Sequence, residues 1–339
     1  MDELIDFSDA RVVVRSYGGS SRKIAVKHGN KVYMLKFSQH HAQHTDTPTN
    51  CVNRVFSEYI CSHITETIGL PVHRTVLGVC DKKTRAVEPG KVVVVGCEDF
   101  RLPGDTNAEF SEFLRAEFRK DEIKPVVRLD QIYTVLNDKS YFTDELREKS
   151  INRYWDTFVV DALVGNSDRH PGNWGYIYNH ERLWVAPIYS FGSCLLPQLS
   201  DEGIDEIIND EYQMLRRCYV FPSPVLCITE EKTGKVGYYD MLSSGYDRHC
   251  SEALLRIAPR INAGKIEEVI DNTPLITPKR KEFYKKYVLL RKRVIIDRAY
   301  GFIRQGTCDT EAKRRIEGHV QFSEGDLQEM IDNRKLDLL

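Results

Sequence analysis

Short runs of β-branched and aromatic residues dominate the first hundred positions of the chain. The runs are ARVVVRS, KIAVKHG, KVYMLKF and KVVVVGC, and glycine, asparagine and charged residues separate them. Apolar runs of this length, bounded by turn-forming residues, are typical of β-strands. We therefore predict a small β-sheet in the N-terminal part of the chain.

One helical pattern interrupts these strands, at about residues 53–69. Its apolar positions recur every three or four residues, which places them on one face of a helix. Gly69 and Pro71 follow directly, and both residue types commonly end a helix. The apolar positions are Val55, Phe56, Tyr59, Ile60, Ile64 and Ile68.

Beyond residue 100 the pattern becomes mostly helical. The segments NAEFSEFLRAEFRK, INRYWDTFVVDALVG and PKRKEFYKKYVLLRKRVIIDRAYGF carry apolar stripes at helical spacing, and SEGDLQEMIDN begins with a Ser-x-x-Asp cap. The pattern changes near Glu98–Gly104. We predict an α+β fold with two lobes, a small β-rich lobe at residues 1–100 and a larger, mostly helical lobe at residues 101–339. Nucleotides commonly bind in the cleft between two such lobes.

Composition and charge narrow the possible functions. The chain has 339 residues and a formal net charge of −2, which argues against nucleic-acid binding driven by overall charge. Nine cysteines without a CxxC pair indicate reduced thiols and a cytoplasmic protein. The acidic start MDELIDFSDARVVV does not resemble a signal peptide, and no apolar run approaches the ~20 residues of a membrane span. Secretion by a route that reads no N-terminal signal is compatible with these features.

The segment LVGNSDRHPGNWG carries the first candidate chemistry. An apolar helix is predicted to end at Gly165, and a strand is predicted to begin at Trp174. Asp168 and Asn173 stand at the spacing of the proton-accepting aspartate and the metal-binding asparagine in kinase catalytic loops. Asp, Asn and Gly are also ordinary turn residues, so this spacing alone leaves a capped turn as an alternative.

A predicted hairpin follows this loop and strengthens the catalytic interpretation. The strands WGYIYN and RLWVAPIY are joined by the turn residues HE, and the second strand leads to Ser190-Phe191-Gly192. This is the pattern of the metal-binding Asp-Phe-Gly motif of kinases, with serine in place of aspartate. In kinase-like proteins such a hairpin brings the catalytic loop and the metal-binding motif within reach of the same phosphates.

The N-terminal strands carry a second constellation. Gly18–Ser21 lie between two predicted strands, and glycines allow backbone N–H groups to approach phosphates closely. Lys36 ends the next strand after an apolar run, as the phosphate-pairing lysine of kinases does. Glu58, in the predicted helix, follows Lys36 in the chain, as the helix glutamate that fixes this lysine does in kinases. Arg54 is an alternative partner for Glu58, and both Lys36 and Glu58 are also common solvent-exposed residue types.

Together these motifs resemble the HipA-like serine/threonine kinase family, in its compact stand-alone type, over about residues 15–200. The segments that carry the resemblance are YGGSSRKI, YMLKF, SEYI, GLPV, GNSDRHPGNWG and APIYSFGS. The resemblance implies a two-lobe protein-kinase-like fold, with ATP and magnesium as ligands. It also implies autophosphorylation of a serine in the glycine-rich loop, Ser20 or Ser21.

The resemblance assigns a role to each matching position. Asp168 is implied as the catalytic base, Asn173 as a magnesium ligand, and His170 as a support of the catalytic loop, although a purely structural role fits His170 equally well. Position 190 is implied as the second metal-holding position. The implied nucleotide-binding residues are Gly18, Gly19, Ser20, Ser21, Lys36 and Glu58, with the main chain of Glu98 and Phe100 near the adenine.

The resemblance also implies the partners. A protein substrate bearing serine or threonine is expected. The further partner is either a DNA-binding antitoxin or, if this protein is an effector sent into host cells, a host protein. Direct binding to nucleic acid is not expected. A kinase-like fold that acts on a small molecule or a lipid is a further alternative.

Ser190 is the departure from the family pattern. Magnesium prefers carboxylate oxygen to a neutral hydroxyl. Loss of one anionic ligand is expected to slow phosphoryl transfer by several orders of magnitude, on a scale of ~3–5 kcal/mol. Three explanations stay open: an introduced substitution, a pseudokinase that binds nucleotide and docks a partner, or another acid that supplies the ligand. The intact Asp168 and Asn173 favour the first.

Three other features invite a function and have simpler explanations. His40, His41 and His44 lie in a polar segment without a further metal ligand nearby, which favours a loop. Cys194 has no histidine placed by the sequence to activate it. The basic run PKRKEFYKKYVLLRKR carries an apolar stripe, Phe283, Tyr287, Leu290 and Val294, that is better explained by core packing.

Overall fold

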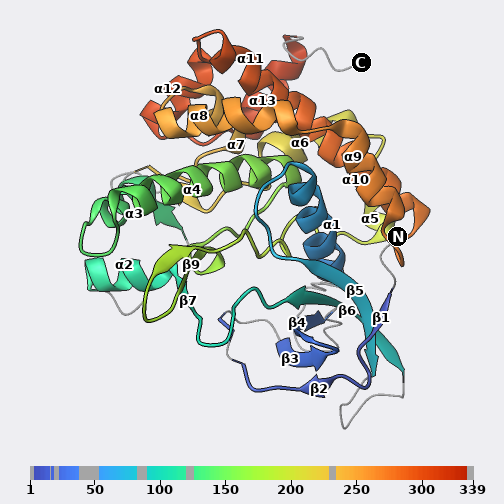
Figure 1. Cartoon of the computed structure of the whole chain (residues 1–339). Coiled ribbons are helices and arrows are strands. Elements are labelled where there is room, and N and C mark those ends of the chain that lie inside the picture. Colours follow the sequence, from blue (N-terminus) through green and yellow to red (C-terminus); the bar gives the residue numbers. More distant parts are fainter. Residues whose placement is uncertain are drawn as a thin grey trace.

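A curled six-stranded sheet forms one end of the molecule, and helices form the other (Figure 1). The computed structural model describes residues 4–15, 17–18, 23–37, 53–81, 90–119, 126–228 and 234–333. The predicted α+β architecture, with a β-rich part followed by a mostly helical part, is confirmed.

The sheet has the strand order β1-β5-β6-β4-β3-β2. All neighbouring strands are antiparallel except β1 and β5, which are parallel. The four predicted runs contribute β2, β3, β4 and β6, although β2 is much shorter than its run; β1 and β5 were not predicted. The bounds are β1 Ile5–Asp6, β2 Arg11–Val12, β3 Lys23–His28, β4 Lys31–Phe37, β5 Thr75–Asp81 and β6 Lys91–Glu98.

The predicted helix is α1, Arg54–Thr67, and it packs against β5 and β6. All six positions of its apolar stripe are buried, which confirms the predicted face. The helix ends where predicted, because Gly69 adopts a φ of 78°, a left-handed conformation that a residue with a Cβ rarely adopts.

The helical part is built around α4, Asp144–Val164, which crosses the molecule below the C-terminal helices (Figure 1). From Ser150 onward nearly every side chain of α4 is buried. The other helices are α2 Phe110–Phe118, α3 Leu129–Asn137, α5 Asp201–Asp205, α6 Glu211–Tyr219, α7 Tyr238–Ser243, α8 Arg248–Ile257, α9 Ala263–Asn272, α10 Pro278–Arg291, α11 Arg298–Arg304, α12 Thr310–Gly318 and α13 Glu324–Asp332. Single 3-10 turns lie at Pro171–Asn173 and Ala258–Arg260.

A three-stranded sheet of order β10-β9-β7 lies beside α2. The predicted hairpin is confirmed as β9, Gly175–Tyr178, and β10, Leu183–Val185. The third strand, β7, Thr106–Glu109, corrects the prediction that residues 107–109 belong to a helix. Its pairing with β9 uses these residues, and the N–H of Glu109 donates to the side chain of Glu112 as a helix cap, so α2 begins only at Phe110. A two-stranded ladder joins β8, Val127–Arg128, to β11, Leu226–Cys227.

The C-terminal basic segment forms the predicted long helix. It consists of α10, a π-helical segment at Lys292–Asp297, and α11. Phe283, Tyr287 and Val294 are buried, which confirms that its apolar stripe packs into the core. Ser323 caps α13 through the predicted Ser-x-x-Asp motif, with the N–H of Asp326 donating to its hydroxyl over 3.1 Å. In the described part of the chain, no helix is long and apolar enough to cross a membrane.

Candidate active site

A cleft of about 530 Å³ lies between the six-stranded sheet and the helical part. Strands β4 and β6 and helix α1 line one side, and the loops around β9 and β10 line the other. A cleft of this volume is typical of a small-ligand site. The candidate residues that line it are Gly18, Lys36, Glu58, Glu98, Phe100, Asp168, His170, Asn173 and Ser190.

Lys36 and Glu58 form an ion pair at the back of this cleft. Alternation along β4 turns Tyr33 and Leu35 into the core and Lys36 toward the cleft. Lys36 Nζ lies 2.8 Å from Glu58 Oε2, and the Glu58 side chain is fully buried. Glu58 therefore pairs with Lys36 and not with Arg54, its alternative partner.

The environment of this pair keeps both groups charged. Burial opposes ionisation of Glu58, but the charge of Lys36 and the contact with His73 outweigh it and hold the pKa of Glu58 well below its usual range. Burial likewise opposes the charge on Lys36, and the Glu58 carboxylate reverses that effect and raises the pKa of Lys36. The pair is thus neutral overall, and it holds the ammonium of Lys36 in a fixed place facing the cleft.

His73 is a residue of the site that the sequence did not reveal. Its Nε2 lies 3.3 Å from Glu58 Oε1, and its ring packs against Phe191. Burial lowers the pKa of His73 and raises the pKa of Cys97 to about 12. Ligand atoms of Glu58, His73 and Cys97 lie within 4.8 Å of one another, but the ammonium of Lys36 already neutralises the carboxylate. We therefore interpret this cluster as the support of an ion pair and not as a metal site.

The loop after α4 holds Asp168 and Asn173 close together. Gly165 ends α4 with a φ of 67°, and the side chain of Asn166 accepts from the N–H of Asp168 over 3.0 Å. Asn173 Nδ2 donates to the carbonyl of Asp168. The Oδ1 atom of Asn173 is therefore available as a ligand, and no cation of the described residues contacts the carboxylate of Asp168.

His170 is held by its own loop. Its Nδ1 accepts from the N–H of Gly172 over 3.1 Å. Because this contact occupies Nδ1, Nε2 is the ring nitrogen that can donate a hydrogen bond. The contact is consistent with support of the loop, and the residue also lines the cleft.

Ser190 occupies a constrained backbone position at the end of the hairpin. Its φ is 71°, in the left-handed region, where asparagine and aspartate are several-fold enriched over other residues. Its N–H donates to Glu58 Oε1 over 3.1 Å. The backbone at position 190 thus suits the aspartate that the kinase pattern expects, while the side chain is a neutral hydroxyl.

Known proteins match this chain over most of its length. The profile of the HipA-like C-terminal domain family matches residues 15–201. The serine/threonine-protein kinase CtkA of Helicobacter pylori strain J99 is 33% identical over 300 residues, which cover 87% of each chain. The chain belongs to the HipA-like kinase family. The predicted resemblance is confirmed, and identity of this extent shows that the chain is a protein kinase.

Solved structures of this kinase family agree with the fold. The crystal structure of the H. pylori proinflammatory kinase CtkA has a TM-score of 0.79 and 30% identity, covering 91% of this chain and all of the other. The toxin–antitoxin complex of HipA, HipB and operator DNA from Shewanella oneidensis MR-1 gives a TM-score of 0.50 at 17% identity. It covers 86% of this chain and 66% of its own, and it supports the fold alone. The predicted kinase-like fold is confirmed.

The predicted glycine-rich loop is described only at Gly18. Gly19, Ser20 and Ser21 lie outside the described residues, as do His40, His41 and His44. A Cβ at Gly18 would lie 1.8 Å from Glu109 Oε1, so Gly18 approaches the end of β7 as closely as only a glycine allows without movement of Glu109. Lys23 Nζ donates to the carbonyl of Gly18.

Tyr17, next to this glycine, is tied to the segment that follows β6. Its hydroxyl donates to Asp99 Oδ2 over 3.1 Å, and the guanidinium of Arg101 lies over its ring. Arg101 Nε also pairs with Asp99 Oδ1 at 2.9 Å. Tyr17 and this segment therefore contact each other where both line the cleft.

Residues 98–100 differ in the main-chain groups that they offer to a ligand. The N–H of Glu98 donates to the carbonyl of Arg74 over 2.9 Å, and the N–H of Asp99 donates to Val32 over 2.8 Å. The described residues provide no acceptor for the N–H of Phe100, which is therefore open to the cleft's contents.

The cleft contains the groups that a nucleotide and a magnesium ion require, with one deficit. Backbone N–H groups and a fixed ammonium suit phosphates, and the oxygens of Asp168 and Asn173 suit magnesium. The hydroxyl of Ser190 is a weaker ligand. Glu58, Glu98 and Asp99 are already paired with cations, so Glu109 and Glu112 are the other carboxylates of the described lining that an additional ligand could use.

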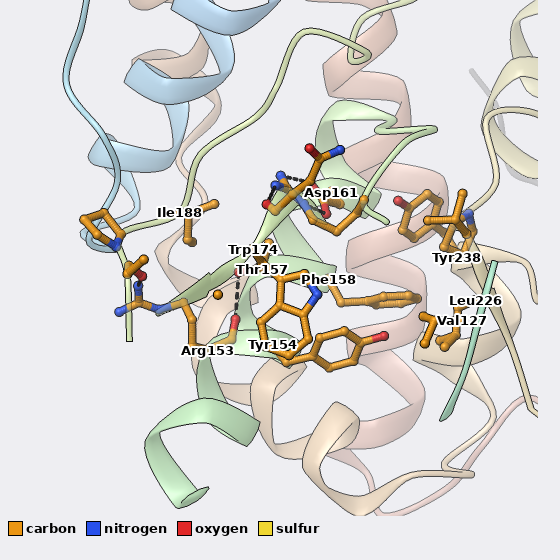
Figure 2. Close-up of a pocket in the computed structure, with 17 residues that line it drawn as sticks. Val127, Arg153, Tyr154, Thr157, Phe158, Asp161, Trp174, Ile188, Leu226 and Tyr238 are labelled. Atoms are coloured by element: carbon orange, nitrogen blue, oxygen red, sulfur yellow. Dashed lines mark hydrogen bonds and ion pairs between the residues drawn. The ribbon is translucent and has the colours of Figure 1, made fainter. Parts of the chain in front are cut away.

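Behind the catalytic loop the helical part is closely packed. A second cavity, of about 30 Å³, lies between α4 and the hairpin (Figure 2). Figure 2 shows that aromatic and aliphatic side chains line it, among them Trp174, Phe158 and Ile188. This volume is that of roughly one water molecule, so the cavity is part of the core and not a ligand site.

Cys194 is buried, and burial raises the pKa of its thiol well above the usual value. A thiolate nucleophile is therefore disfavoured at this position. This agrees with the sequence, in which no histidine was placed to activate Cys194.

Proposed function

We propose that this protein is an ATP- and magnesium-dependent serine/threonine kinase. The observation that carries the proposal is that Lys36, held by Glu58, faces the same cleft as Asp168 and Asn173. Three segments that are distant in the sequence thus contribute a cation, a free carboxylate and an amide oxygen to one site. Phosphoryl transfer requires these groups together.

Each group has a proposed role in the transfer. Lys36 pairs with the phosphates of ATP, and the loop that begins at Gly18 covers them. The N–H of Phe100 and the main chain of Glu98 approach the adenine. Asn173 and position 190 would hold magnesium, which would there neutralise charge that develops on the phosphates. His170 supports the catalytic loop.

Asp168 is the proposed base. Its carboxylate accepts the proton of the substrate hydroxyl while that oxygen forms a bond to the γ-phosphorus, and the bond from phosphorus to the bridging oxygen of ADP breaks. The free carboxylate is suited to this step because no described cation competes for its lone pairs.

Ser190 supports a second candidate, a pseudokinase that binds nucleotide and docks a partner. The nucleotide-binding groups do not depend on residue 190, whereas magnesium binding does. We propose that the chain with Ser190 binds ATP and transfers phosphate slowly, and that aspartate at 190 restores transfer.

The test is a comparison of the chain with Ser190→Asp and Ser190→Asn. Transfer from radiolabelled ATP and binding of ATP are measured for all three. We expect similar ATP binding, and a gain in transfer of about 10²–10³ with aspartate but not asparagine, since one well-placed charged group contributes on that scale. ATP binding without transfer in any of the three would favour the pseudokinase. No ATP binding would contradict both functions.

The partners and setting are proposed from the same family membership. The substrate is a protein with a serine or threonine hydroxyl. The segment after β6 is proposed as the hinge between an N-terminal lobe, residues 1–100, and a C-terminal lobe, residues 101–339. Every cysteine that the structure describes is a free thiol, which suits a cytoplasmic site of action. If the partner is a DNA-binding antitoxin, the protein acts in the cytoplasm of the cell that makes it. If the protein is an exported effector, it acts in the cytoplasm of a host cell. The net charge of −2 disfavours direct binding to nucleic acid.

A further inference from the structure

The peptide unit between Tyr189 and Ser190 is held from both sides of the cleft. Its carbonyl, from Tyr189, accepts from Arg169 Nη1. Its N–H, from Ser190, donates to Glu58 Oε1 over 3.1 Å. A cation of the catalytic loop and an anion of α1 therefore fix the orientation of one peptide plane.

Arg169 connects this peptide to the catalytic loop. The same Nη1 atom donates to the carbonyl of Asn173 over 2.8 Å. One nitrogen thus contacts the main chain at Asn173 and immediately before Ser190, the two proposed metal-holding positions. Their separation is set by the reach of a single guanidinium.

Asp161 binds the other edge of the guanidinium and neutralises its charge. Arg169 Nε lies 2.8 Å from Asp161 Oδ2, and Nη2 lies 2.9 Å from Oδ1. Both side chains are almost fully buried. Burial opposes the charge on Arg169, but Asp161 outweighs it and raises the pKa of Arg169. Asp161 also accepts from Asn166 Nδ2 over 2.9 Å, so the pair is anchored to the loop.

We propose that Arg169, neutralised by Asp161, is a positioning residue that sets the spacing and backbone orientation of the two metal-holding positions, 173 and 190. This inference rests on the proposed function. It accounts for the fixed plane of the peptide that precedes Ser190, whose φ is 71°. Lysine cannot replace Arg169, because one ammonium does not provide a planar fork that reaches two carboxylate oxygens and two carbonyls.

The test uses Arg169→Lys and Asp161→Asn, each made in the full chain and in the Ser190→Asp protein. Another ion pair of the same helix supplies matched controls. Arg256 Nη2 lies 2.6 Å from Asp156 Oδ1 on a face of α4 that packs against α8. Arg256→Lys and Asp156→Asn therefore disturb a pair of the same chemistry away from the metal-holding positions.

Two readouts separate positioning from simple destabilisation. The first is amide hydrogen exchange in the segment 187–192, which follows the bond from Ser190 to Glu58 without requiring a ligand. The second is the affinity for a fluorescent ATP analogue, measured with EDTA and with magnesium. In the Ser190→Asp protein we expect Arg169→Lys to leave the affinity in EDTA unchanged and to reduce the tightening by magnesium about tenfold, the usual scale for a residue that orients a metal ligand.

The expected result is faster exchange at 187–192 and loss of magnesium tightening in Arg169→Lys and Asp161→Asn, with both controls unchanged. Equal exchange and equal magnesium dependence in the Arg169→Lys and Arg256→Lys proteins would overturn the inference alone. Failure of the Ser190→Asp protein itself to bind the ATP analogue would overturn the proposed function, and with it the positioning role. If Arg169→Lys does not fold, Asp161→Asn provides the same comparison.

Discussion

The N–H of Ser190 donates to the carboxylate of Glu58, and the second oxygen of that carboxylate holds Lys36 at 2.8 Å. One buried side chain of α1 therefore touches both the phosphate-facing cation and the backbone of the metal-holding segment. A shift of α1 would move both together. The proposed active site depends on this shared carboxylate.

The first prediction concerns Glu58→Gln. The amide keeps the shape but leaves the partly buried Lys36 ammonium without a counter-charge, so we expect the free energy of unfolding to fall by about 3 kcal/mol. Urea denaturation measures the change. Glu66→Gln, at an exposed position of the same helix, should change stability by less than about 0.5 kcal/mol. Equal stability of the two variants would show that the pair contributes nothing.

The second prediction concerns the pH dependence of stability. The pKa of His73 is lower in the folded protein than in the unfolded chain. Over the pH range between the folded pKa and the unfolded pKa of about 6.5, His73 therefore binds a proton in the unfolded chain but not in the folded protein. Stability conferred by neutral His73 is therefore present above pH ~6.5 and is lost as the pH falls, at up to about 1.4 kcal/mol per pH unit. Glu58, whose folded pKa is also lowered, acts in the same direction below about pH 4.3.

Comparison of two histidine variants isolates this effect. His73→Gln should flatten the fall in the free energy of unfolding between pH 7 and 5. His180→Gln, at an exposed position, should leave the slope unchanged. Parallel pH profiles for the parent and His73→Gln would contradict the burial of a neutral imidazole against Glu58.

The third prediction concerns the serines of the glycine-rich loop. Family resemblance implies that Ser20 or Ser21 is autophosphorylated, and the loop begins at Gly18, which lines the cleft. After incubation of the Ser190→Asp protein with ATP and magnesium, mass spectrometry should find phosphate in the peptide that contains these residues. Addition of Asp168→Asn should abolish it. Phosphate that persists in the double variant would come from a different base or a contaminating kinase.

The fourth prediction concerns Arg291, which is fully buried in α10. Its guanidinium donates to the carbonyls of Ala162, Arg217 and Cys218, and no carboxylate of the described residues contacts it. Arg291→Lys keeps the charge but leaves carbonyls unpaired, so we expect a loss of about 2 kcal/mol in the free energy of unfolding. Arg293→Lys, exposed two residues later, is the control. An unchanged midpoint for Arg291→Lys would show that α10 does not anchor α4.

The sequence allowed prediction of the residues whose chemistry is tied to a local motif. Asp168, Asn173 and Ser190 stand in loops with their own spacing, and the structure brings them to one cleft with Lys36. The helix over residues 53–69 and the first strand of the hairpin were predicted with nearly correct bounds, whereas the second strand, predicted over residues 182–189, ends at Val185.

The supporting residues could not be predicted because tertiary packing creates their contacts. His73 meets Glu58 only when β5 pairs beside α1, and β5 itself was not predicted. Asp161 left a weak signal, as a single carboxylate in the apolar run VVDALV, where a buried helix requires a partner for it. The partner, Arg169, lies in the following loop, and spacing alone does not identify the pair.

The central claim is that Lys36, Asp168 and Asn173 act on one bound nucleotide. The most direct measurement compares phosphoryl transfer and ATP affinity in the Ser190→Asp protein with and without Asp168→Asn. The account predicts that transfer falls by at least about 10²-fold, because a general base contributes on that scale, while the affinity for ATP stays within about twofold, since Asp168 does not hold the nucleotide in this account. Transfer at the same rate in both proteins would contradict it.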